Sequence, residues 1–232
     1  MYRNQYIESC LENQNSLFKN LTQKEKEVIL LHHFHSFFKK GEQIIEEGEK
    51  ARGLLYLGSG KIKIFKIGVG GREQILSMGR QYGFMGFNYM FSDSPSPFSV
   101  SAVEDCDVVF IDKNPLLKIL KKNAELCLLF MKEMSEEIIF LNNRLVSLTQ
   151  KHIRGRIAET LLLLRDTYGT EPDGKTIRAM LSREDIAHLS NMTTSNAIRT
   201  LSNMAAEKLI QIEGRRLMIL NNTKLEHISD LG

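Results

Sequence analysis

Residues 181–210 decide the fold of the C-terminal part of this chain, and they read LSREDIAHLSNMTTSNAIRTLSNMAAEKLI. Ser182 followed by Asp185 is a capping-box pattern, which opens a short helix. Asn191 ends that helix, because asparagine tolerates the left-handed backbone that a tight turn needs. Thr193 then caps a second helix. The stretch therefore predicts two helices joined by a short turn.

The second helix has an apolar inner face and a polar outer face. Its inward positions, Ala197, Leu201 and Met204, are spaced i, i+4, i+7, and the small Ala187 lets the first helix approach closely. Helix-turn-helix units of this size place their second helix in the DNA major groove. We expect DNA to be bound by residues on this outer face and by nearby basic residues: Arg183, Thr194, Ser195, Asn196, Ile198, Arg199, Ser202, Arg215 and Arg216.

The outer face suggests a role for each of four side chains. Arg199 can donate two hydrogen bonds to guanine, the commonest specific base contact. Ile198 can contact a thymine methyl group. Thr194 and Ser195, near the helix N-terminus, suit phosphate or base-edge contacts. The alternative is a helical hairpin with ordinary solvated polar residues.

A basic hairpin follows the second helix. Residues 209–213 and 217–220 read as two strands around Gly214, Arg215 and Arg216. A hairpin behind a recognition helix forms a wing. The two arginines at its tip would meet the DNA backbone.

Upstream, residues 123–148 carry the strongest periodic signal of the chain, the pattern of a long helix. Its apolar residues recur at spacings of 4 and 3, which is a heptad repeat. These residues are Cys127, Met131, Met134, Ile138, Leu141, Leu145 and Leu148. Such a seam predicts a coiled-coil contact with a second copy of the chain, and two-fold homodimers are the commonest oligomers. The alternative is that both apolar faces of the helix are core. We place the domain boundary after residue 149, giving domains 1–149 and 150–232.

In the N-terminal part, the expected secondary structure changes from helix to strand at residue 38. A helix is expected over residues 16–38, followed by short β-prone runs that are separated by glycine-containing turns. The runs cover residues 43–46, 53–57, 61–67, 73–77, 99–103 and 108–111. Strands at roughly 8–12-residue spacing predict an antiparallel sandwich or barrel.

Composition excludes several classes of protein. The 232 residues are 42% hydrophobic and 25% charged, ordinary globular values that argue against disorder. No window approaches the roughly 18 apolar residues of a membrane span, and the polar N-terminus lacks a signal-peptide core. We expect a cytoplasmic protein without membrane contact. The net charge of +3 permits a nucleic-acid partner but does not demand one.

The potential metal ligands follow no recognisable site pattern. Three cysteines lie far apart without CxxC spacing, which excludes a structural zinc site and leaves too few thiolates for an iron–sulfur cluster. His32, His33 and His35 cannot all face one metal from a helix. We therefore expect no metal site.

The motifs together resemble the Crp/Fnr family of transcriptional regulators over nearly the whole chain. The stretches FFKKGEQIIEEGE (residues 37–49) and GLLYLGSGKIKIFKIGVGGREQIL (residues 53–76) look like the opening strands of that family's cyclic-nucleotide-binding jelly roll. The resemblance implies an α+β protein: an N-terminal antiparallel β jelly roll (double-stranded β-helix), a long dimerisation helix and a C-terminal winged helix-turn-helix. It also implies a homodimer on a palindromic double-stranded DNA operator, an effector in the roll and contact with RNA polymerase.

The departures from the family concern the effector. Relatives that bind cyclic AMP carry a Gly-Glu pair for the ribose and an Arg-Ser or Arg-Thr pair for the cyclic phosphate. The matching stretches here read Gly86-Phe87 and Pro97-Phe98-Ser99. A buried phosphate without its guanidinium loses a charge-assisted bidentate pair. We therefore expect that cyclic AMP is not the effector.

The stretches around these departures suggest a different pocket. The residues that would line it are Phe84, Met85, Gly86, Phe87, Phe98 and Ser99. Such a pocket suits an apolar small molecule or no ligand, and haem is a further candidate ligand. The cysteine cluster of oxygen-sensing relatives is missing, which argues against an iron–sulfur cluster.

Two other classes of function compete with a regulator. One is a ligand-binding module whose C-terminal domain contacts protein rather than DNA. The other is a cupin-like enzyme, which needs two histidines on barrel strands. Residues 38–112 contain no histidine, so we expect no enzyme.

Overall fold

The structure is a computed structural model that describes residues 5–14, 16–50, 52–92 and 94–232. The chain packs into two compact units. The first holds the residues up to Lys66 together with Met78–Ile139, and the second holds Ile67–Ser77 and Phe140–Gly232.

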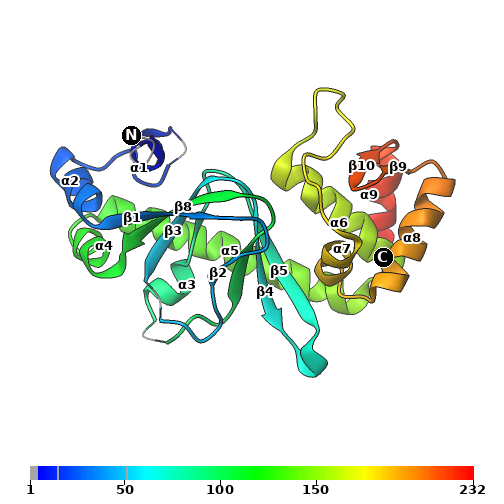
Figure 1. Cartoon of the computed structure of the whole chain (residues 1–232), viewed down its shortest axis with the longest axis horizontal. Coiled ribbons are helices and arrows are strands. Elements are labelled where there is room, and N and C mark those ends of the chain that lie inside the picture. The colour runs from blue at the N-terminus through cyan, green and yellow to red at the C-terminus, as the bar shows by residue number, and fades with distance from the viewer. Residues whose placement is uncertain (1–4, 15, 51, 93) are drawn as a thin grey trace. The chain divides into compact units, whose positions relative to one another are not determined.

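The first unit is built on an antiparallel β-roll of two four-stranded sheets (Figure 1). One sheet has the order β1 (His33–Phe38), β8 (Cys106–Asp112), β3 (Gly53–Ser59), β6 (Phe84–Met85). The other has the order β2 (Gln43–Ile45), β7 (Ser99–Ala102), β4 (Ile62–Ile67), β5 (Glu73–Gly79). A 3-10 turn, η1 (Val69–Gly71), lies between β4 and β5. The antiparallel roll predicted from the glycine-punctuated runs is confirmed, and all six predicted strands are present.

Five helices accompany these strands. They are α1 (Gln5–Glu12), α2 (Gln23–Leu31), α3 (Phe87–Met90), α4 (Lys113–Leu120) and α5 (Ala124–Gln150). The side chains of β3 point alternately to the two faces of its sheet. Leu54 and Tyr56 face the helices, and Leu55 and Leu57 face the other side of the sheet. All four side chains are fully buried.

The helix expected over residues 16–38 is present only at residues 23–31 and is wrong on both sides of that range. Helix α2 begins after Thr22, whose side chain forms a capping box with Glu25, and ends at Leu31. After His32 the chain forms strand β1, which is paired along its whole length with β8. The Phe34 ring stacks on Phe110 at 4.7 Å. Pairing with a neighbouring strand, which a local pattern does not report, overrides the apolar periodicity.

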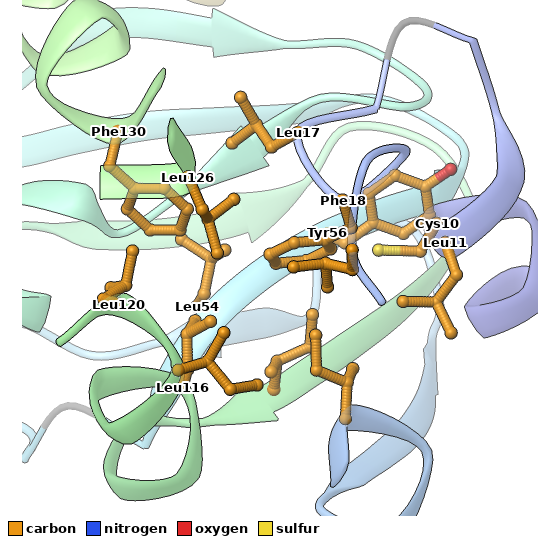
Figure 2. Packing of buried hydrophobic residues seen from close by; sticks show 14 of the residues in the cluster. Cys10, Leu11, Leu17, Phe18, Leu54, Tyr56, Leu116, Leu120, Leu126 and Phe130 are labelled. Carbon is orange, nitrogen blue, oxygen red and sulfur yellow. The ribbon is translucent and has the colours of Figure 1, made fainter. Parts of the chain in front are cut away.

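A hydrophobic core lies between the β1-β8-β3-β6 sheet and the helices. Figure 2 shows Leu126 and Phe130 of α5 with Leu116 and Leu120 of α4 around Leu54. Phe18, from the segment before α2, lies on the same core, with its ring edge-on to Phe84 at 5.2 Å. This core fixes the first half of α5 against the roll.

The second unit is a winged helix-turn-helix. Its elements are α6 (Ile153–Tyr168), α7 (Arg183–Leu189), α8 (Thr194–Ala206), β9 (Ile210–Glu213), β10 (Arg216–Ile219) and α9 (Asn222–Leu231). Helix α6 packs against α9, α8 and α7. The predicted two helices and hairpin are confirmed. Between α6 and α7, Thr176 forms an isolated antiparallel bridge with Met218 of the wing.

No helix in the described part of the chain is long and apolar enough to cross a membrane.

Candidate DNA-binding site

Helix α7 begins with the capping box that the sequence predicts. The Ser182 hydroxyl accepts a hydrogen bond from the Asp185 amide at 2.9 Å, and the Asp185 carboxylate accepts one from the Ser182 amide at 3.3 Å. Both interactions satisfy amide groups that have no partner within the helix. The start of α7 is therefore fixed by its own sequence.

The turn between the two helices depends on Asn191. Its φ of +50° lies in the left-handed region, as expected for the asparagine of a tight turn. Met192 donates from its amide to the Ala187 carbonyl at 3.0 Å, which folds the chain back on α7. Ser190 is fully buried, and its hydroxyl bonds that of Thr160 on α6 at 2.8 Å. These contacts set the angle at which α8 leaves the turn.

The two faces of α8 are as the sequence predicts. Thr193 caps the helix by accepting from the Asn196 amide at 3.3 Å. Ala197, Leu201 and Met204 are buried, and Ala187 on α7 is also fully buried. The outer face is left to polar residues and to one apolar side chain.

That outer face holds most of the candidate DNA contacts. Ser195, Ile198, Arg199 and Ser202 are exposed, and Ile198 keeps 47% of its surface. Thr194 and Asn196 are half-buried beside them. The Arg199 guanidinium donates to the Asn196 side-chain oxygen at 3.0 Å, one helical turn away. The face thus presents hydrogen-bond donors and acceptors with one methyl-bearing side chain, the groups that read base edges.

The wing presents two further cations. Gly214 has a φ of +58°, which a two-residue hairpin turn needs, and Arg215 and Arg216 are exposed. Arg183 does not join the outer face of α8. Its guanidinium donates to the Gly214 carbonyl at 2.7 Å and is half-buried.

Two of the six candidate effector residues, Phe84 and Phe87, pack into the core between the sheet and the helices. The Phe84 ring packs on Phe18 and Tyr56, and the Phe87 ring lies edge-on to Phe130 at 5.2 Å. Both rings thus belong to the core beneath the helices.

The other four candidates are held elsewhere in the first unit. Met85 pairs with Leu55 at the sheet edge. Gly86 has a φ of +95° at the start of α3, and Phe98 is buried. The Ser99 hydroxyl accepts from the Gln43 side chain at 3.2 Å and from the Glu47 amide at 3.0 Å, so its oxygen already has two donors.

The outward face of α5 differs from the predicted seam. Cys127 and Met134 are partly buried against the core of the first unit, and Leu148 is half-buried. Met131, Ile138, Leu141 and Leu145 are exposed. Three further apolar residues of α5, which are not part of the predicted seam, are exposed as well: Leu128, Ile139 and Val146.

The cysteine thiols lie in the interior. Cys10 and Cys106 are buried and Cys127 is half-buried. Burial raises the pKa of the Cys106 thiol to about 11, which disfavours the thiolate that metals bind. Among the described residues, no group of three His, Cys, Asp or Glu is arranged to hold a metal ion.

Comparison with known proteins gives two domain matches and several relatives. Residues 35–123 match the cyclic nucleotide-binding domain, and residues 155–228 match the Crp-like helix-turn-helix domain. The CRP-like cAMP-activated global transcriptional regulator of Mycobacterium tuberculosis is 26% identical over 190 residues, covering 81% of this chain and 84% of that protein. The anaerobic regulatory protein of Bacillus subtilis is 28% identical over 184 residues, covering 78% and 77%.

A solved structure shares the fold. The structure of FixK2 from Bradyrhizobium japonicum superposes with a TM-score of 0.77 at 19% identity, covering 84% of this chain and 96% of that one. With a cyclic nucleotide-binding domain ahead of a Crp-like helix-turn-helix domain, the chain belongs to the Crp/Fnr family of DNA-binding transcriptional regulators, which are not enzymes.

Proposed function

We propose that the protein acts as a homodimer that binds a palindromic DNA operator through a pair of α8 helices. The observation that carries this proposal is the outer face of α8. Ile198 and Arg199 are exposed there, on a helix whose start is capped by Thr193. A two-fold dimer would present two such faces to half-sites one helical turn apart. Residues 1–149 would form the sensing half and residues 150–232 the DNA-binding half.

The dimer seam that we propose runs along the exposed side of α5. Leu128, Met131, Ile138 and Leu145 are 65, 58, 56 and 63% exposed and are spaced 3, 7 and 7. Ser135 and Asn142 fill the positions between them, and a single asparagine in a coiled-coil seam favours one register at a cost in stability. We call these six residues the α5 stripe.

The effector that we propose is not cyclic AMP. Phe87 and Phe98 stand where the cyclic-AMP-binding members of the family carry their charged anchors, and both are buried. The Ser99 oxygen already accepts from Gln43 and from the Glu47 amide. An anion here would lack a guanidinium partner and would have to displace internal bonds, which costs several kcal/mol. An apolar small molecule or haem is the class that we propose instead.

By family resemblance we also propose RNA polymerase as a partner of the protein. We propose the cytoplasm as its location. A salt titration tests the central part. Binding to mixed-sequence duplexes should weaken as salt rises, with a slope set by the number of neutralised phosphates. Salt-independent behaviour, or binding only to another protein, would favour a ligand-binding module that contacts protein.

The effector part is tested on the purified protein. Calorimetric titration with cyclic AMP should give no binding heat. Native mass spectrometry and an absorption spectrum should reveal any retained small molecule or haem. Cyclic AMP binding with ordinary affinity would contradict this part and leave the DNA-binding part intact.

A further inference from the structure

Arg183 is the first residue of α7, and its guanidinium is turned toward the wing. The Nη2 group donates to the carbonyl oxygen of Gly214 at 2.7 Å, across 31 residues of sequence. Gly214 is the first residue of the hairpin turn, Arg215 is the second, and Arg216 begins β10 directly after it. One side chain therefore links the start of the helix-turn-helix to the tip of the wing.

The rest of the guanidinium also lies toward the protein. Nη1 is buried and has no hydrogen-bond partner in the part of the chain that the structure describes. Burial lowers the pKa of Arg183, although arginine stays charged at any physiological pH. An arginine that reached a DNA phosphate from here would have to leave the Gly214 carbonyl.

The base of the wing has other attachments. The Ile177 amide donates to the Leu217 carbonyl at 2.9 Å, and the Ile219 amide donates to the Lys175 carbonyl at 3.0 Å. These backbone bonds hold β10 from one side. The turn itself contains a glycine with a φ of +58°, the residue type with the greatest backbone freedom. Fixing the Gly214 carbonyl therefore restricts the direction in which Arg215 and Arg216 project.

We propose that Arg183 is a positioning residue, which holds the wing tip so that Arg215 and Arg216 meet the DNA backbone together. It acts through the wing and does not itself bind DNA. This assignment replaces the direct DNA contact expected from the sequence. It rests on DNA binding by the helix-turn-helix domain.

A double-mutant cycle tests the assignment. Full-length protein is measured on one mixed-sequence duplex with and without Arg183→Gln, in the natural background and in an Arg215→Ala/Arg216→Ala background. With the wing arginines present, Arg183→Gln should weaken binding about tenfold, because coupled neighbours show interaction energies of this size. Without them it should change binding less than about twofold.

The other outcomes of the cycle overturn the assignment. An equal loss in both backgrounds means that Arg183 binds DNA by itself, and its removal would then lower the salt slope by about one phosphate in each. No loss in either background means that Arg183 has no role in binding. Failure of the unmutated protein to bind any duplex would instead count against DNA binding itself.

Two further measurements separate positioning from general stability. Arg183→Lys keeps one donor and should recover part of the lost affinity. Hydrogen exchange of the Gly214–Arg216 amides should accelerate in Arg183→Gln, while exchange in α8 stays unchanged. Unchanged exchange at the tip in Arg183→Gln would overturn the assignment, and this measurement does not depend on a binding assay.

The matched control is Arg178→Gln. Arg178 is an exposed arginine in the same unit, with its guanidinium 3.8 Å from the Glu171 carboxylate. The control removes the same charge without touching the wing tip. Its effect on affinity should be the same in both backgrounds, and a background-dependent effect would remove the support that the cycle gives to Arg183.

Discussion

The ring of Tyr6 lies flat against the imidazole of His35, with centroids 5.6 Å apart and planes 7° from parallel. Asp107 of β8 binds both: its carboxylate accepts from the Tyr6 hydroxyl at 2.8 Å and lies 2.8 Å from His35 Nε2. The Ser59 hydroxyl donates to the same carboxylate at 2.8 Å. These bonds fasten α1 to strands β1, β3 and β8.

Replacing this carboxylate should make the stability of the protein depend differently on pH. Burial raises the pKa of Asp107, but the bonds from Ser59, Tyr6 and His35 outweigh it and hold the pKa below its usual value. A lowered folded-state pKa adds stability above the unfolded value of about 3.9, and this stability is lost as pH falls through the folded pKa. Asp107→Asn should therefore cost about 1–3 kcal/mol at pH 7.

Thermal unfolding at pH 7 and at about pH 3 checks this expectation. The difference between Asp107→Asn and the natural protein should shrink at the lower pH, because the stability that a lowered pKa contributes is lost as pH falls from the unfolded value toward the folded one. The control is Asp230→Asn, at an exposed position on α9. A difference that stayed constant between the two pH values would mean that the charge of Asp107 contributes nothing.

The α5 stripe should control self-association. Ile138→Lys places a charge in the middle of the proposed seam, where it would be buried without a partner. We expect a monomer by sedimentation at concentrations where the natural protein is a dimer. Asn143→Lys introduces the same charged side chain on another exposed side of the same helix and should leave the dimer intact. If the two variants had the same oligomeric state, the proposal that the α5 stripe forms the dimer contact would be refuted.

Arg199 and Arg216 should affect DNA binding in different ways. Arg199→Ala should cost about 1–3 kcal/mol on a selected operator and relax the preference at one base pair in each half-site. Arg216→Ala should weaken all duplexes alike and reduce the salt slope by about one. Binding-site selection with each variant separates the two effects. A uniform loss in Arg199→Ala would make that residue a phosphate contact.

Gly53 should tolerate no side chain. A Cβ atom there would lie 1.8 Å from the backbone carbonyl oxygen of Ile111, on the neighbouring strand. Because backbone in a sheet cannot move aside cheaply, Gly53→Ala should destabilise the protein by more than roughly 2 kcal/mol in chemical denaturation. At Gly68 the nearest atom would be the Arg72 carbonyl oxygen at 3.5 Å. Gly68→Ala should change stability by less than about 1 kcal/mol, and equal losses would contradict the steric argument.

The sequence predicted the elements whose signal is local. The caps at Ser182 and Thr193 and the turn at Asn191 depend on neighbouring residues, and the structure has all three. Strand β1 was missed because its partner, β8, lies about 70 residues away. Similarly, no local pattern shows that the Phe84 and Phe87 rings pack into a core built from Phe18 and Phe130. The bond from Arg183 to the wing could not be predicted either, because its acceptor is the backbone carbonyl of Gly214, a group that every residue carries.

Helix α5 is one unbroken stretch of 27 residues. Within it, the consecutive residues Ile139 and Phe140 belong to different packing units. Each residue in a helix advances the chain by about 100° around the axis. Deleting a single residue here would turn every later side chain of α5 by about 100° and take Asn142 and Leu145 out of line with the rest of the α5 stripe. A change of seven or of eleven residues, within about 20° of two or three full turns, would keep the two ends of the stripe on one side of the helix.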